Sequence, residues 1–472
     1  MDLYRALVAP IRRLPAEVLE IVFISCLDSD DDYTAVRLII TRICFFWRHI
    51  ARNAPKFWTP LKVRFGISLP HYAVAEASLP EFQTRMKFVE SWVALASSSP
   101  LTFHLSIGTF STGPIFVCWR AILSSMLGFS STLTCLLLYV PVSFFNFFLK
   151  LPGNTWGVLE TVVLHIRPSP HDQVDPFIQW SDPKHTVFVG ANHLRCLELS
   201  ISTPLPYETL PIPWSQITSL RIKTTLRFGS IGAGAWYTIL QKCINLGKCV
   251  VEVAHHDMVF AKPLILDHLE TFDLKVVSSN PTNLANTLHQ MYFPNLMHLR
   301  YNANRGIVHT PSFTTRISST LESLYLDSSL NVDRLHALLQ SLPNLRVFHC
   351  KFKQHHVCEV LSNSNNPVSF GLEELTLHHH IPLEPRADCV YNIVKFRRTD
   401  RRVVKVRSLI LTVGVGFPEE EKVELWERIS PFVEDGFRYQ FAVDGKWFFF
   451  CSNRVHSVRP SFRRINIHIP SI

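Results

Sequence analysis

Two histidine-rich spots carry residue types that could bind a metal ion. One contains Cys350, His355, His356 and Cys358, and the other is the run His378 to His380. A zinc site needs paired ligands at short spacing in a tetrahedral frame. Cys350 also falls on a buried position of a predicted strand, and adjacent histidines on a strand point apart. We therefore expect no metal at either spot, and no other cofactor.

Sequence motifs that mark common enzyme classes are missing. The chain has no GxSxG nucleophile elbow, no GxxxxGK[ST] phosphate loop and no GxGxxG turn after a strand. The densest basic run, 395–407, could serve nuclear import or nucleic-acid binding, but the sequence favours a solvated insertion loop. The net charge of +9 is mild and diffuse. We expect no enzyme and no nucleic-acid partner, with a hydrolytic or metal enzyme as an open alternative.

The composition indicates a folded protein with reduced thiols. The 472 residues are 47% hydrophobic and 18% charged, which is ample material for a core. The cysteines include no CxxC pair, and the first residues have no apolar signal-peptide region, so we expect a cytoplasmic or nuclear protein. The apolar run 133–149 contains Pro141 and Asn146 and is short for a membrane span. A buried strand followed by a connection is expected there, and no membrane partner.

Residues 14–61 predict three short helices. Apolar residues recur at steps of three and four from Val18 to Leu27, the acidic run 28–32 breaks the helix, and two further helical stretches end at Pro55. Three such helices form a very small core, and the apolar residues exceed what that core can bury. Surplus apolar side chains on a small helical unit suggest a protein-binding surface.

This segment resembles an F-box, in wording closest to the F-boxes of mushroom-type (basidiomycete) fungi. An LPxE opening, a C-x-x-W-R-x-I-A core and a P-x-x-W close appear in order. Ile43 stands where Val is usual, and Phe45-Phe46 replaces a more polar pair. The residues that carry the resemblance, and that it implies for adaptor binding, are Leu14, Pro15, Glu17, Leu19, Ile21, Phe23, Ile43, Cys44, Trp47, Ile50 and Trp58.

The resemblance implies that residues 10–65 dock on a Skp-type adaptor and, through it, on a cullin. Helical phase divides the side chains. It predicts that Val18, Leu19, Val22 and Trp47 hold the helices together, and that Leu14, Pro15 and Ile21 face the adaptor. A generic three-helix cap on the following array is the structural alternative.

From residue 133 onward one spacing recurs, an apolar residue followed by apolar positions three and five further on. Positions three and five share one face of a strand, and helix-like stretches such as 235–244 and 332–345 lie between units. The unit starts lie roughly 23 to 35 residues apart, mostly near 25, in or slightly above the range of leucine-rich repeats. The eleven units begin at Leu133, Leu159, Leu194, Ile217, Leu246, Leu269, Leu296, Leu321, Leu345, Leu372 and Val406.

The array resembles a leucine-rich-repeat solenoid, which implies an α/β fold with a parallel sheet on the concave face of a curved stack. The asparagine that often closes the strand segment is mostly missing, and long gaps at 164–194 and 377–406 suggest inserted loops. We expect an F-box at 10–65, a helical linker at 66–100, the repeats at 101–416 and a C-terminal cap at 417–472. The cap should contain a helix and a hairpin with Asp444-Gly445 at its turn.

Side chains between the buried strand positions should face the concave surface and mix both signs of charge with aromatic rings, which favours a protein substrate. With the F-box resemblance, this predicts a substrate-recognition subunit of a cullin–RING ubiquitin ligase. A repeat scaffold that recruits no ligase is the alternative. The candidate substrate-binding residues are Glu198, Arg221, Lys223, Asp273, Lys275, Arg300, Tyr325, His349 and Lys351.

Overall fold

The computed structural model divides into two compact units, 1–230 and 231–472, which we describe separately. It describes residues 14–28, 33–65, 78–107, 115–167, 186–201, 210–224, 233–253, 263–276, 290–303, 317, 319–327, 332–352, 356–363, 367–379, 387–413, 419–443, 446–451 and 454–457. Most of the acidic run 28–32, together with His355, His380, Asp444 and Gly445, lies outside these residues.

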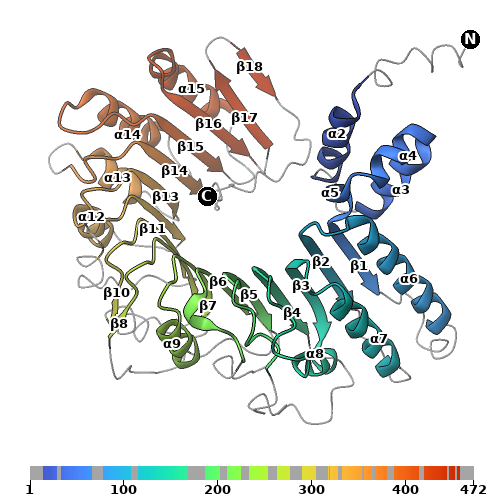
Figure 1. Cartoon of the computed structure of the whole chain (residues 1–472). Helices are drawn as coiled ribbons and strands as arrows, with labels where there is room; N and C mark the ends of the chain where they lie inside the picture. Colours follow the sequence, from blue (N-terminus) through green and yellow to red (C-terminus); the bar gives the residue numbers. More distant parts are fainter. Residues whose placement is uncertain are drawn as a thin grey trace, which may run out of the picture. The chain divides into compact units, whose positions relative to one another are not determined.

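Unit 1 is a helical N-terminal segment followed by a parallel sheet, with β1 to β6 paired in sequence order. In Figure 1, α6, α7 and α8 lie along one side of β1 to β4. Its elements are α2 (Ala16–Asp28), α3 (Tyr33–Ile43), α4 (Phe45–Arg52), α5 (Pro55–Trp58), β1 (Pro60–Phe65), α6 (Ser78–Ala96), β2 (Leu101–Ile107), α7 (Ile115–Gly128), β3 (Leu133–Pro141), α8 (Val142–Leu149), β4 (Thr161–Arg167), β5 (Cys196–Ile201), the 3-10 helix η3 (Trp214–Gln216) and β6 (Ser219–Thr224).

Unit 2 continues the same architecture with β7, β9 and β11 to β16 paired in parallel, while β8 and β10 form a separate two-stranded ladder. Its elements are α9 (Ala233–Lys242), β7 (Lys248–Val253), β8 (Leu264–Ile265), β9 (Thr271–Val276), β10 (Met291–Tyr292), β11 (His298–Ala303), β12 (Ser323–Asp327), α12 (Val332–Gln340), β13 (Val347–Phe352), α13 (His356–Ser362), β14 (Glu374–His379), α14 (Ala387–Thr399), β15 (Ser408–Val413), α15 (Glu419–Glu434), β16 (Arg438–Val443), β17 (Lys446–Cys451) and β18 (Arg454–Ser457).

The recurring apolar spacing corresponds to strands throughout. Each of the eleven repeats has a strand that contains the apolar residues three and five positions after its first apolar residue. All three of these apolar residues are buried in every repeat. Neighbouring strands align these positions; Leu136, for example, is paired with Val162 and Leu138 with Leu164. The predicted α/β fold with a leucine-rich-repeat-like parallel sheet is therefore confirmed.

Side-chain amides tie successive repeats together at the position just before the first buried residue. Asn295 Nδ2 donates to Asp267 O at 2.6 Å, and Asn344 Nδ2 donates to Ser319 O at 2.7 Å. Gln216 Nε2 makes the equivalent bond to Ala191 O in unit 1. A side-chain amide can donate to a main-chain carbonyl. These residues therefore hydrogen-bond each repeat to the loop of the preceding repeat.

The sheet begins earlier than predicted, because β1 pairs in parallel with β2. Segment 66–100 was expected to be a linker, yet its helix α6 packs against α5 and β1 as a repeat helix does. The indole rings of Trp58 and Trp92 lie 5.5 Å apart, and the buried Arg37 lies over Trp92 while its Nε donates to Phe57 O. The N-terminal helices and the first repeat thus share one core, and the boundaries at 65 and 100 do not separate modules.

The C-terminal segment contains the predicted helix, α15, and the predicted hairpin, in which Val443 is paired with Lys446. Its first strand differs from the expected cap, because β16 pairs in parallel with β15 and so extends the array. The antiparallel strands β17 and β18 follow it. The array therefore runs beyond 416.

Two segments that the sequence predicts as loops contain helices. After β3 the chain enters α8, with Pro141 at its N-cap and Phe144, Phe145 and Phe148 buried. The basic run 395–407 starts inside α14, whose buried face carries Val390, Ile393, Val394 and then Arg397. Arg397 is fully buried and donates to Ser369 O at 2.8 Å and to Val368 O at 2.6 Å. This run therefore begins in a repeat helix, whereas residues 400–407 form the largely exposed connection to β15. Among the helices that the structure describes, none combines the length and apolar character needed to cross a membrane.

Candidate protein-interaction surfaces

The C-x-x-W-R sequence builds a helix start. Cys44 is the N-cap of α4, and its Sγ accepts a hydrogen bond from Trp47 N at 3.4 Å. The Trp47 ring packs on Phe23, with ring centroids 5.0 Å apart. Arg48 Nε donates to Thr41 O in the last turn of α3. A side chain that accepts from the third residue of a helix satisfies one of its unpaired N–H groups, so this spacing fixes the corner between α3 and α4.

Several residues of the F-box-like sequence lie inside the helical segment. Leu19, Phe23, Ile50 and Trp58 are buried, and Trp58 Nε1 donates to Ala51 O at 2.6 Å. These four were candidates for adaptor binding, but they have no surface to offer and instead pack the helices. Trp47, Cys44 and Leu14 are half-buried, whereas Pro15, Glu17, Ile21 and Ile43 are exposed.

Large apolar side chains remain exposed on these helices in two clusters. The α2 stripe consists of Val18, Ile21 and Val22, at the spacing of one helix face, with Ile21 64% exposed. Val18 and Val22 were expected to hold the helices together, and instead both are partly exposed. The α3–α4 corner consists of Ile39, Ile43, Phe45 and Phe46, with Phe45 79% exposed. Such a concentration on a small helical segment is typical of a partner-binding surface.

The sheet face of each unit, formed by the side chains between the buried positions, carries the candidate substrate-binding residues. In unit 1, Glu198 is paired with Arg221 in the strand register, and Lys223 lies two residues further along β6. Glu198 Oε1 lies 2.7 Å from Lys223 Nζ and 3.8 Å from His165 Nε2, and Glu198 Oε2 lies 3.6 Å from Arg221 Nη1. Burial lowers the pKa of His165, with Glu198 acting in the opposite direction.

In unit 2, the candidate residues Asp273, Arg300, Tyr325 and His349 occupy one register position on β9, β11, β12 and β13. Arg300 Nε lies 3.8 Å from Asp273 Oδ2, and its guanidinium lies 4.3 Å from the Tyr325 ring centroid. Burial lowers the pKa of His349, and Arg300 adds to this shift.

A second register position of the unit 2 sheet, two residues further along the strands, carries Lys275 and Lys351. The strand register aligns Lys275 with Asn302 on β11 and Asp327 with Lys351 on β13. Lys275 Nζ lies 2.7 Å from Glu252 Oε1. The sequence therefore predicted which residues lie on the sheet face, whereas their ion pairing with neighbouring strands emerges from the structure.

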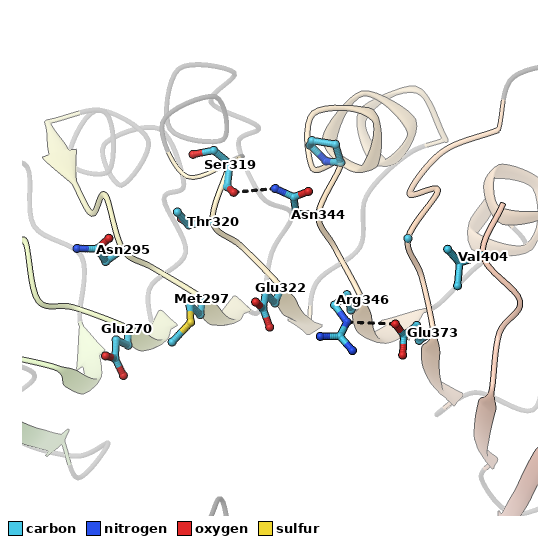
Figure 2. Close-up of a pocket in the computed structure, with 12 residues that line it drawn as sticks. Glu270, Asn295, Met297, Ser319, Thr320, Glu322, Asn344, Arg346, Glu373 and Val404 are labelled. Atoms are coloured by element: carbon cyan, nitrogen blue, oxygen red, sulfur yellow. Dashed lines mark hydrogen bonds and ion pairs between the residues drawn. The ribbon is translucent and has the colours of Figure 1, made fainter. Parts of the chain in front are cut away.

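A groove of about 690 Å³ follows the edge of the unit 2 sheet, at the residues just before each strand. Figure 2 shows Glu270, Met297, Glu322, Arg346 and Glu373 along this edge. Glu373 accepts from Arg346 Nε at 3.2 Å, and Arg407 Nη1 lies 3.2 Å from its other oxygen. The pKa of Arg346 is raised, first by its hydrogen bond to Glu373. These pairs link neighbouring repeats. Sequence reasoning missed them because it considered only the side chains between the buried strand positions, although a charged residue recurs directly after the first apolar residue of several repeats, as at Glu270, Glu322 and Glu373.

Among the described residues, which exclude His355 and His380, no three His, Cys, Asp or Glu side chains gather closely enough to hold a metal ion. Cys350 is buried in β13 and Cys358 is buried in α13. Burial raises the pKa of Cys350 to about 12. A thiol that resists ionisation is a poor metal ligand.

Comparisons with known proteins find similarity among solved structures. No family model matches the chain, and no curated protein matches it. Among solved structures, the chain is similar to "Crystal structure of TLR13-ssRNA13 complex", at 16% sequence identity and a TM-score of 0.30. The match covers 69% of this chain and 37% of that chain, so the chain spans little more than a third of that protein's length.

Proposed function

We propose that the protein is the substrate-recognition subunit of a cullin–RING ubiquitin ligase. The N-terminal helices would dock on a Skp-type adaptor, and the sheet face would hold a protein substrate. The chain would supply proximity, because holding a substrate beside the ligase raises its effective concentration there. A leucine-rich-repeat scaffold that recruits no ligase is the second candidate, favoured by the shared core of the N-terminal helices and the first repeat, which a structural cap would also have.

The observation that carries the proposal is the exposure of apolar residues on α2, α3 and α4. A structural cap should shield the end of an array with polar side chains. Here the α2 stripe and the α3–α4 corner present Ile21, Ile39, Ile43 and Phe45 to solvent, each more than half exposed. The buried motif residues pack the helices together, and the exposed ones are left for a partner.

The test is adaptor capture by the full chain with Ile21→Ser and Phe45→Ser, one residue from each cluster. Truncating a central apolar anchor of an interface typically costs about 2–4 kcal/mol, or roughly a thirty- to thousandfold loss of affinity. We expect the double variant to lose capture in a pull-down with a Skp-type adaptor while its circular dichroism stays unchanged, since both side chains lie outside the core.

The matched control is Ile244→Ser with Val189→Ser. Ile244 is 61% exposed and Val189 is 60% exposed, and neither lies on the N-terminal helices. The control should bind the adaptor as the wild type does. Equal loss in both variants would indicate non-specific stickiness, and failure of the wild type to bind any Skp-type adaptor would move the scaffold to first place.

A further inference from the structure

The two units differ in the charge of their sheet faces. In unit 1, basic residues outnumber acidic ones among the described side chains that alternate with the buried positions. The basic residues are Lys62, Arg167, Arg221 and Lys223, and the acidic one is Glu198. In unit 2 the same positions are balanced, with Lys248, Lys275, Arg300 and Arg438 against Glu252, Asp273, Asp327 and Glu374.

An aromatic platform adjoins the basic residues of unit 1. The Tyr139 and His165 rings stack with centroids 4.1 Å apart and an interplanar angle of 12°, and the His104 ring lies 4.9 Å from that of Tyr139. Strand pairing puts Tyr139 beside His165, and Lys223 two strands further on. Because neighbouring strands lie about 4.8 Å apart, the platform and the basic side chains are within reach of one short peptide.

Glu198 lies between these groups and is contacted by several of them. It faces Lys223, Arg221 and His165 at once and is itself 20% exposed, whereas the Arg221 and Lys223 side chains are each 42% exposed. Because Arg221 and Lys223 share this one carboxylate and are both exposed, each can also pair with a second carboxylate. A second anion would, however, meet repulsion from Glu198.

We propose that the sheet face of unit 1 binds an extended acidic segment of a protein partner, with a carboxylate of the segment paired to Arg221 and Lys223 and a neighbouring side chain packed on Tyr139 and His104. This inference rests on the proposed function, because it names the substrate chemistry of the sheet face. A peptide fits better than a nucleic acid. A phosphate backbone needs basic side chains along its whole path, and here Glu198 interrupts them.

The experiment measures fluorescence anisotropy of a labelled peptide of alternating glutamate and alanine with the full-length chain at low salt. The Arg221→Ala, Lys223→Ala double variant removes two exposed ion pairs and should weaken binding about three- to thirtyfold. Glu198→Gln, which keeps the shape of the side chain, should instead tighten binding severalfold because it removes the competing carboxylate. Added salt should weaken binding to the wild type.

The matched control is Lys248→Ala with Arg438→Ala, which removes the same two side-chain types from the sheet face of unit 2 at positions that are not candidate substrate-binding residues. This variant should bind within about twofold of the wild type, which is under half a kcal/mol. Equal weakening by both double variants would overturn the proposal in favour of diffuse charge attraction. Weakening by Glu198→Gln would overturn the carboxylate competition on which it depends.

A single-stranded oligouridine of equal charge distinguishes the other class of macromolecule. Tighter binding of the RNA, lost in the Arg221→Ala, Lys223→Ala variant, would replace a peptide surface with a nucleic-acid surface. No adaptor is present in these measurements, so their failure leaves adaptor capture unaffected, and loss of adaptor capture leaves the peptide result standing.

Discussion

Gly190 provides a sharp test of how the loops of unit 1 pack. Its N–H donates to Gly153 O at 2.8 Å. A Cβ at position 190 would lie 2.5 Å from that same oxygen and 2.9 Å from Asn154 Cα, both main-chain atoms. Real Cβ contacts this short do not occur, so Gly190→Ala must push the two loops apart and break the hydrogen bond between them.

The expected loss follows from those two effects. Forcing an extra methyl group into a packed site typically costs about 1–3 kcal/mol, and a lost main-chain hydrogen bond adds about 0.5–1.5 kcal/mol. The loops also carry Trp156 and Phe188, both buried against Phe148. We expect Gly190→Ala to lower the free energy of unfolding of unit 1 by about 1.5–4.5 kcal/mol, the sum of these two contributions.

The assay is urea unfolding of the full chain followed by tryptophan fluorescence. Gly157→Ala is the control, because a Cβ at Gly157 would meet nothing within 4 Å. An open glycine with ordinary backbone angles gains about 0.4–1 kcal/mol on change to alanine. A wild-type transition for Gly190→Ala, or the same loss in both variants, would refute the close approach of the two loops.

Three further outcomes are expected. Arg397→Ala removes the hydrogen bond to Val368 O and one of two hydrogen bonds to Ser369 O, which also accepts from Leu372 N, and should destabilise unit 2 by about 1–3 kcal/mol in the same urea assay; a wild-type midpoint would contradict this. Burial lowers the pKa of His165 and His349, so their stabilising effect is complete above about pH 6.5 and is lost as the pH falls through their folded-state pKa values. As the pH is lowered below 6.5, the melting temperature should therefore fall, and it should fall less in a variant with both histidines changed to Gln. Removing residues 417–472 exposes the edge of β15 and should cause aggregation visible by light scattering, and a soluble fragment with an unchanged melting profile would show that the segment is no cap.

Regular spacing made most of the sheet predictable from the sequence. Two of the missed strands, β2 and β16, have the apolar residues three and five positions further on, but the residue that should begin the spacing is not a large apolar one. Pro100 precedes Phe103 and Leu105 in β2, and Gly436 precedes Tyr439 and Phe441 in β16. In β1 the spacing is complete, at Trp58, Leu61 and Val63, but the tryptophan had been assigned to the helical motif. A search for aliphatic residues alone passes over these strands.

Roles that depend on a neighbouring element were not predictable. Arg397 continues the apolar face of α14 at helical spacing after Ile393 and Val394, yet its charge indicated solvent. Only the carbonyls of the preceding repeat explain its burial. Similarly, helical phase placed Leu19 correctly in the core but could not show that Val18 and Val22 face outward, because the packing of α2 depends on where α4 lies.

The shared core around Trp58 and Trp92 has a consequence for synthesis. The N-terminal helices leave the ribosome before α6, but the ring that packs on Trp58 belongs to α6, and so does the second ring over which Arg37 lies. At roughly 5–20 residues per second, the chain needs roughly another 2–7 s to reach Trp92 after Trp58 has been added. During that interval the exposed isoleucine and phenylalanine side chains of α2 to α4 belong to an unfinished fold. The N-terminal helices therefore complete their core only when the helix of the first repeat has been made.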